Sequence, residues 1–182
     1  METGTLWTIG HSTREWDAFA GMLGTAGIAT LVDVRRFAGS RRNPQFSGEA
    51  MARALPVAGI AYVAMPDLGG RRRPDPQSRN DAWRNDSFRG YADYMQSGEW
   101  RRARDALAGV ALRGPTAVMC AEAMWWQCHR ALIADDFKAS GWRVLHLLSA
   151  TRTEEHPYSK AARIVGGRLD YSLPPPPQGT LL

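Results

Sequence analysis

Two cysteines and a histidine occur close together in the second half of the chain, in a segment that could do thiol chemistry. Cys120 is followed by Glu122, and Cys128 is followed directly by His129 and Arg130. A thiolate is both a nucleophile and a metal ligand, a nearby imidazole can act as a general base, and a guanidinium can hold a carboxylate or phosphate. We therefore expect Cys120 or Cys128 to be the nucleophile or a ligand, and Arg130 to hold an anion.

The same cysteines admit a metal-binding interpretation. Cys120 and Cys128 have seven residues between them, whereas zinc sites are typified by cysteine pairs about two to four residues apart. We therefore assign no metal ligand, but a metal-binding protein stays as an alternative, with His129 and His11 as further candidate ligands. A structural disulfide is not expected in a chain without an export signal.

Apolar and amphipathic runs alternate along the 182 residues and predict the fold class. Strands are predicted at 6–9, 29–34, 60–65, 116–120 and 142–148. Helices are predicted at 14–24, 47–55, 88–96, 99–108, 127–139 and 159–165. This order predicts a single three-layer α/β domain over residues 1–172, with a mostly parallel sheet of about five strands and helices on both faces. A proline-rich tail would follow at 173–182.

Side chains that could act in catalysis or ligand binding follow the ends of the predicted strands. The carboxyl ends of parallel strands meet at one edge of a sheet, where such sheets bind ligands. The residues at those positions are His11, Ser12, Asp33, Arg35, Asp67, Gly69, Gly70, Cys120 and Glu122. Their convergence predicts an active site. His146, inside an apolar run, is instead expected to be a core histidine.

Side-chain chemistry suggests a role for each member of this cluster. His11 or His129 would be the general base, at the ~3 Å that proton transfer requires. Asp33 and Glu122 would orient the histidines and arginines, and Arg35 would help to hold an anion. The alternative is an internal network of ion pairs that fixes the strand order, binds no ligand and leaves no cavity.

Three further side chains complete the predicted ligand-binding set, namely Arg41, Tyr62 and Trp126. The other members of that set are Ser12, Arg35, Gly69, Gly70 and Arg130. Trp126 and its neighbour Trp125 could stack on a base or ring, or form a hydrophobic lid or interface patch.

The net charge of +5 comes mostly from arginine, and a polar loop from 69 to about 85 carries much of it. Arg71, Arg72 and Arg73 lie in this loop, and Trp83 follows them. Basic and aromatic residues together are compatible with a nucleic-acid surface, and equally with a solvated loop. A nucleic-acid-binding or nucleic-acid-modifying domain is therefore a second alternative.

The motifs together resemble the prokaryotic domain-of-unknown-function family 488, over residues 5 to about 172. The matching segments are residues 8–12, 32–35, 40–41, 43–46, 62, 68–70, 88, 91, 119–122 and 128–130. The family often has proline where this chain has Ala38. The resemblance implies a cytosolic α/β domain with a shared polar site, but it implies no reaction.

The leading hypothesis is an enzyme-like pocket that binds a small anionic or nucleotide-like ligand. No apolar run approaches the ~20 residues of a membrane span, and no signal peptide is recognisable, so we expect a cytoplasmic protein without a membrane partner. The sequence leaves open whether the protein is an enzyme, which cofactor it takes, and its oligomeric state.

Overall fold

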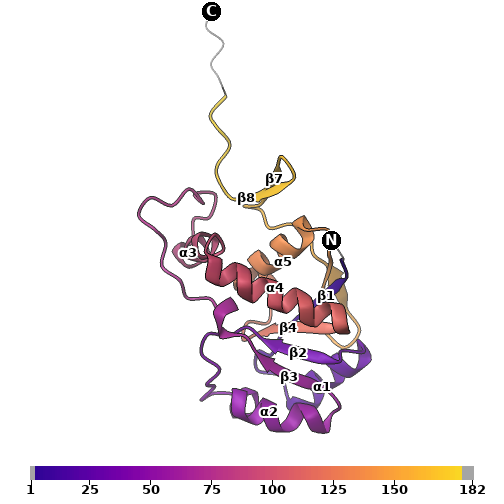
Figure 1. Ribbon diagram of the computed structural model, residues 1–182. Helices are drawn as coiled ribbons and strands as arrows, with labels where there is room; N and C mark the ends of the chain where they lie inside the picture. Colours follow the sequence, from indigo (N-terminus) through magenta and orange to yellow (C-terminus); the bar gives the residue numbers. More distant parts are fainter. Residues whose placement is uncertain (1–2, 178–182) are drawn as a thin grey trace, which may run out of the picture.

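The computed structural model describes residues 3–177 (Figure 1), so residues 178–182 of the predicted tail lie outside the described part. Its strands are β1 (Thr5–Gly10), β2 (Thr30–Asp33), β3 (Ala61–Ala64), β4 (Thr116–Cys120), β5 (Arg143–Leu147), β6 (Thr153–Glu155), β7 (Arg163–Val165) and β8 (Arg168–Asp170). Its α-helices are α1 (Trp16–Thr25), α2 (Gly48–Val57), α3 (Asp86–Tyr94), α4 (Gly98–Arg113) and α5 (Arg130–Ala139). Short 3-10 turns are η1 (Pro44–Phe46), η2 (Pro66–Leu68) and η3 (Trp125–Gln127).

The main sheet has six strands in the order β3-β2-β4-β1-β5-β6. The first five are parallel, as predicted, and β6 adds an antiparallel edge strand beside β5. Gly10 at the end of β1 lies opposite Cys120 at the end of β4, and Asp33 at the end of β2 lies opposite Met119. The ends of β1, β4 and β2 are therefore neighbours at one edge of the sheet.

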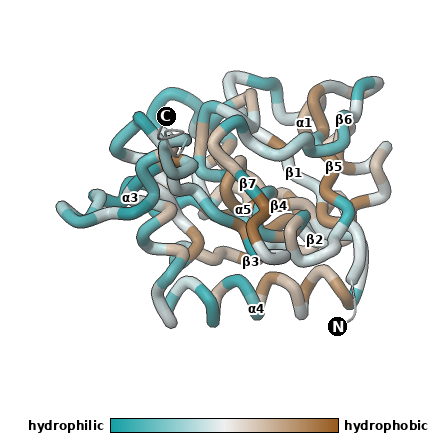
Figure 2. The backbone as a smooth tube through the Cα atoms, turned by 90° about the horizontal axis from the view of Figure 1, so that it is seen from above, coloured by the Kyte–Doolittle hydropathy of each residue, from teal (hydrophilic) through white to brown (hydrophobic). Residues whose placement is uncertain are grey.

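Helices cover both faces of the sheet, which confirms the three-layer prediction (Figure 1). Successive strand residues point to opposite faces. Ile9 and Met119 join the core beneath α1 and α2, whereas Leu6 and Val118 join the core beneath α3, α4 and α5. In Figure 2, β5 and α5 are brown while the loops around α3 are teal. No helix within residues 3–177 is long and apolar enough to cross a membrane.

Side-chain caps fix where three of the helices begin. Ser47 accepts a hydrogen bond from the Ala50 N–H at the start of α2, Asn85 caps α3 and Ser97 caps α4. Such caps satisfy backbone donors that the first helical turn leaves free. The predicted start of the fifth helix at 127 was wrong, because η3 comes first and α5 begins at Arg130.

The loop at residues 69–85 forms no helix or strand, as predicted, yet side-chain contacts hold it in place. The Asp93 carboxylate on α3 accepts hydrogen bonds from the Asp75 N–H at 2.8 Å, the Ser78 hydroxyl at 2.6 Å and the Asn80 amide at 2.7 Å. This anchoring fixes the loop beside the carboxyl edge of the sheet.

The helix predicted at 159–165 was also wrong. Residues 163–165 form β7, which pairs with β8 as a small antiparallel hairpin. The turn between the strands is Gly166-Gly167, with φ of 56° and 74°. Two adjacent glycines with positive φ favour a tight hairpin turn over a continuing helix.

Candidate active site

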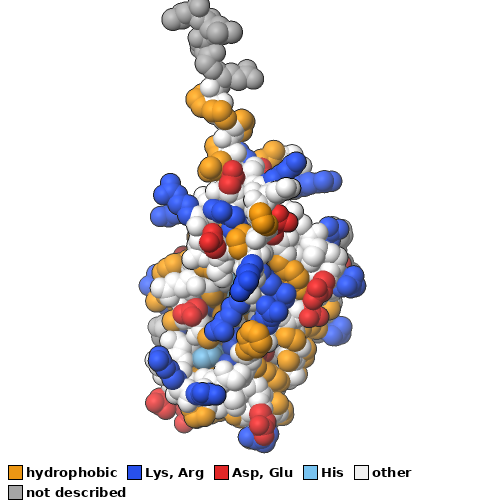
Figure 3. Space-filling model, turned by 90° about the vertical axis from the view of Figure 1, so that its left-hand side faces the viewer, with side chains coloured by type: hydrophobic (Ala, Val, Ile, Leu, Met, Phe, Trp, Pro, Cys, Tyr) orange, Lys and Arg blue, Asp and Glu red, His pale blue; other side chains and the backbone are white. Residues whose placement is uncertain are grey.

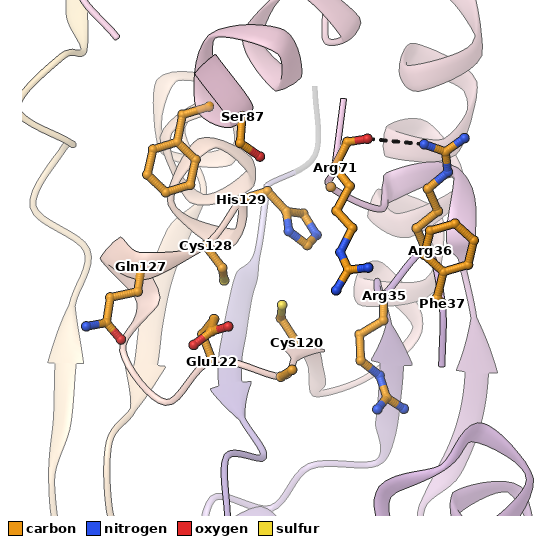
Figure 4. Close-up of a pocket in the computed structure, with 13 residues that line it drawn as sticks. Arg35, Arg36, Phe37, Arg71, Ser87, Cys120, Glu122, Gln127, Cys128 and His129 are labelled. Atoms are coloured by element: carbon orange, nitrogen blue, oxygen red, sulfur yellow. Dashed lines mark hydrogen bonds between the residues drawn. The ribbon is translucent and has the colours of Figure 1, made fainter. Parts of the chain in front are cut away.

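A pocket of about 230 Å³ opens at the carboxyl edge of the sheet (Figure 4). Six of its lining residues were predicted from the sequence, namely Arg35, Gly70, Cys120, Glu122, Cys128 and His129. Part of the polar cluster therefore lines a hollow. This contradicts the expectation that the motifs leave no cavity, whereas other members of the cluster bind one another.

Cys120 at the end of β4 and Cys128 just before α5 form a coupled pair of thiols in this pocket. The pKa of Cys120 is lowered to about 6, mainly because the neighbouring Cys128 thiol can direct its hydrogen at the Cys120 sulfur. Burial opposes this shift, while Arg130 and backbone N–H groups assist it. The pKa of Cys128 is raised, first by burial and then by Cys120. At neutral pH the pair therefore holds one proton, with the thiolate on Cys120.

His129 presents one imidazole nitrogen to the pocket. Its Nε2 lies 3.1 Å from the carbonyl oxygen of Val34 and must donate to it, since a carbonyl only accepts. Burial lowers the pKa of His129, so the ring is neutral and Nδ1 keeps a free lone pair. A Cβ at Gly70 would lie 2.8 Å from this Nδ1. Glycine at position 70 therefore leaves Nδ1 accessible.

Arg130 is turned inward and is occupied by protein atoms, so it does not provide the anion contact that the sequence suggested. Its side chain is almost fully buried. Its Nε donates to Cys128 Sγ at 3.2 Å and its Nη1 to Thr8 Oγ1 at 3.4 Å. Its Nη2 donates to the carbonyl oxygens of Glu122 and Ala123. Arg130 therefore holds both ends of the segment that joins the two cysteines.

Asp33, Arg35 and His11 form a second network behind the pocket. The Asp33 carboxylate accepts from Arg35 Nε at 2.9 Å and Nη2 at 2.7 Å, and from the Tyr62 hydroxyl at 2.7 Å. Arg35 Nη1 donates to His11 Nε2 at 3.1 Å, and His11 Nδ1 then donates to the carbonyl oxygen of Ser12. Both nitrogens of His11 are used, so His11 orients Arg35 and has no lone pair left for a substrate proton.

Arg35 has little capacity left for a ligand. Its guanidinium points away from the two sulfurs in Figure 4, toward Asp33 and His11. Asp33 orients an arginine, as predicted. The Glu122 carboxylate, by contrast, receives no hydrogen bond from the described residues, so its predicted orienting role has no structural basis.

The other predicted ligand-binding residues lie away from the pocket wall. Arg41 and Trp126 are exposed, and Trp126 packs edge-on against Trp125. Ser12 has a left-handed backbone, with φ of 47°, and contributes its carbonyl to His11. Gly69 is a packing residue, since a Cβ there would lie 2.6 Å from the backbone nitrogen of Arg36.

Arg71 is the most important pocket residue that the motif analysis missed as a ligand contact. Figure 4 shows its guanidinium directed between Cys120 and His129, while its carbonyl oxygen accepts from Arg36 Nη1 at 3.2 Å. Its φ of 60° lies in the left-handed region, which a non-glycine residue adopts only at a cost. The only signal in the sequence was the arginine run of the loop. The remaining unpredicted lining residues are Arg36, Phe37, Ser87, Phe88, Ala121 and Gln127.

Cys120, Cys128 and His129 could also supply ligands to a metal ion. One ligand atom from each lies within 4.8 Å of the others. His11, the fourth candidate, is committed to Arg35 and Ser12. The guanidinium groups of Arg130 and Arg71 beside the sulfurs place positive charge where a cation would bind. This electrostatic environment favours an anion over a dication.

A buried hydrogen-bond chain runs from Arg130 through the core. Arg130 donates to Thr8 Oγ1, which lies 2.7 Å from His146 Nδ1. His146 Nε2 lies 2.9 Å from His156 Nδ1, and His156 Nε2 lies 2.9 Å from Asp135 Oδ1. These hydrogen bonds can all run in one direction, with Thr8 donating to His146, His146 to His156 and His156 to Asp135. In the opposite direction His146 would donate to Thr8, and the hydroxyl hydrogen of Thr8 would have no acceptor among these groups.

Acidification should destabilise the fold through its buried histidines. The pKa values of His11, His129 and His146 are all lowered, each mainly by burial, and that of His146 falls to about 2. Below about pH 6.5 the unfolded chain therefore binds more protons than the folded one, and stability falls as pH falls. Each histidine contributes a slope approaching about 1.4 kcal/mol per pH unit. Urea unfolding at about pH 7 and about pH 5 measures this effect, and equal stabilities at the two values would contradict it.

Comparison with known proteins identifies the family. The family model "Domain of unknown function DUF488" matches residues 15–137. The chain belongs to this family. No curated protein and no solved structure matched it. The DUF488 match includes Asp33, Arg35 and both cysteines, whereas His146 and His156 lie beyond it.

Proposed function

We propose that this DUF488 protein is a cysteine-dependent enzyme that acts on a small anionic substrate. The supporting observation is the Cys120 sulfur, which lines the pocket, lies within 4.8 Å of the Cys128 sulfur and faces the Arg71 guanidinium. A thiolate beside a cation in an accessible hollow is the arrangement that reactive cysteines require. We also propose a cytoplasmic location, where disulfides rarely persist and both cysteines would remain available as thiols.

In this proposal each group has one task. The Cys120 thiolate attacks the electrophilic atom of the substrate, and Arg71 holds the anionic group. His129 Nδ1 accepts a hydrogen bond or proton from the bound molecule. Arg36 supports Arg71 by donating to its carbonyl oxygen, and Arg130 keeps Cys128 beside Cys120.

The alkylation of Cys120 by iodoacetamide should show a thiol pKa of about 6. The rate should rise up to that pH and then level off, because the thiolate is the reacting species. Rates are followed by mass spectrometry of the intact chain, and the C120S variant identifies the reacting residue. A rate that keeps rising up to about pH 8.5, as for free cysteine, would overturn the proposal.

Anion preference can be tested with the same reaction. Iodoacetate carries a negative charge that iodoacetamide lacks, so Arg71 should raise the ratio of the iodoacetate rate to the iodoacetamide rate. The R71Q variant should lower this ratio by about 10-fold, at the low end of electrostatic effects on association. R73Q is the matched control, because Arg73 is exposed in the same loop but does not line the pocket. An equal loss in both variants would mean that only net charge matters.

A nucleic-acid substrate is the second candidate. Figure 3 shows a band of Lys and Arg side chains across one face of the molecule, next to hydrophobic side chains. The anion that Arg71 holds would then be a phosphate of the nucleic-acid backbone, and binding should weaken steeply with salt. Fluorescence anisotropy with a labelled single strand at low and physiological ionic strength measures this. Absence of binding at low ionic strength would eliminate the candidate.

A further inference from the structure

Two thiols lie in one pocket, and the proposed function gives a reacting role to Cys120 but not to Cys128. Both cysteine side chains line the pocket, and the Cys128 thiol is the main cause of the lowered pKa of Cys120. Their sulfurs lie within 4.8 Å of each other, whereas a disulfide requires about 2.05 Å. Residues 121–129 between β4 and α5 contain only the short turn η3, so closing the remaining gap requires no change in a strand or α-helix.

Arg130 prepares Cys128 to carry negative charge. The thiol of Cys128 stays protonated while the charge is on Cys120. A covalent bond from Cys120 to a substrate removes that charge. In the structure the Arg130 Nε–H already donates to Cys128 Sγ at 3.2 Å. A guanidinium hydrogen bond stabilises a thiolate more than a thiol. Substrate attachment at Cys120 therefore activates Cys128.

We propose that Cys120 and Cys128 together reduce small anionic disulfides, with Cys128 as the resolving thiol. This inference rests on the proposed nucleophilic role of Cys120. In the first step the Cys120 thiolate attacks one sulfur of the substrate. A mixed disulfide forms, the substrate S–S bond breaks, and one substrate thiolate leaves and takes the Cys128 proton.

In the second step the Cys128 thiolate attacks the Cys120 sulfur of the mixed disulfide. The Cys120–Cys128 disulfide forms, and the second substrate thiolate leaves and takes a proton from water. Two electrons have passed from the protein thiols to the substrate disulfide. A thiolate with a pKa near the ambient pH is well suited to such exchange.

The pocket charge selects the substrate class. Arg71 and Arg36 lie on one side of the two sulfurs, and Glu122 is the only acidic residue among the lining residues (Figure 4). A disulfide that bears carboxylates places negative groups against the arginines. The departing thiolate is stabilised by the same charges. Neutral and cationic disulfides gain the second interaction only, and a cationic group is in addition repelled by the arginines.

The test uses the full-length reduced chain with oxidised glutathione, quenched in acid and analysed by intact mass spectrometry. The wild-type chain should lose two hydrogen atoms, showing an internal disulfide, and release two equivalents of reduced glutathione. The C128S variant should accumulate one glutathione on Cys120, because the second step is blocked. The C120S variant should remain unmodified on the same timescale.

The outcomes separate this inference from the proposed function. If the wild-type chain also stops at a glutathione adduct on Cys120, the resolving role of Cys128 is overturned while the nucleophile stands. If Cys120 shows the alkylation profile of free cysteine as well as no exchange, both proposals fail. Hydroxyethyl disulfide and cystamine, which are neutral and cationic, should react at least about 10-fold more slowly than oxidised glutathione. R71Q, with R73Q as control, should remove that preference, and equal wild-type rates for all three would overturn the substrate class.

Discussion

Replacing Arg130 with methionine is expected to lower the free energy of unfolding by about 3–5 kcal/mol. Arg130 is 1% exposed and donates hydrogen bonds to Cys128, Thr8 and the carbonyl oxygens that follow Cys120. Methionine fills a similar volume but donates nothing, so these acceptors lose their partner inside the protein. An unsatisfied buried polar group costs about 1–3 kcal/mol.

Urea unfolding of the R130M variant measures this loss. The control is R53M, because Arg53 is 70% exposed and pairs only with the exposed Glu49. An exposed ion pair contributes at most about 1 kcal/mol. R130M should also raise the pKa of Cys120, since the Arg130 charge helps to lower it. A stability loss no larger than that of R53M would show that the four contacts of Arg130 carry little energy.

The location of the site could be predicted because the sheet is parallel. Strand ends in such a sheet share one edge, so the residues after each apolar run had to be neighbours. Asp33 and Cys120 confirm this, since β2 and β4 are paired and end together. The prediction needed only the positions of the strands and their common direction, which the alternation of apolar and amphipathic runs indicated.

The roles of individual side chains were less predictable, because they depend on which partner each one meets. His11 and Arg130 have the residue types of catalytic groups, but His11 is held by Arg35, and Arg130 by backbone carbonyls and Cys128. Arg71 has the residue type of a solvated loop residue, yet an anchored loop and a left-handed backbone direct it into the pocket. These contacts arise between segments distant in sequence, which local patterns do not encode.

The short C-terminal hairpin illustrates a different limit. Strands β7 and β8 have only three residues each, too few for a period of two to be distinguished from helical spacing. The Gly166-Gly167 turn was the better signal, because paired glycines are typical of tight hairpin turns. The hairpin leads into Tyr171, whose hydroxyl reaches Asp135 in the core.

The D135N substitution should lower the free energy of unfolding by about 3 kcal/mol or more. The fully buried Asp135 carboxylate accepts hydrogen bonds from His156 Nε2, the Ser159 N–H and the Tyr171 hydroxyl. An amide has one oxygen and one NH₂ group, so it cannot accept from all three donors, and at least one of these hydrogen bonds is lost or reversed. The Y171F variant removes one hydrogen bond and leaves the carboxylate with two partners, so it should cost only about 1 kcal/mol.

The D135N variant also tests the direction of the buried chain. If its NH₂ group faces His156, Nε2 must become an acceptor, and the hydrogen of His156 must move to Nδ1. His146 would then have to accept at Nε2 and donate from Nδ1 to Thr8, leaving the Thr8 hydrogen without an acceptor in the chain. Nitrogen chemical shifts of the two imidazoles report this tautomer change. Unchanged tautomers together with a stability loss equal to that of Y171F would show that Asp135 does not set the orientation of the chain that ends at Arg130.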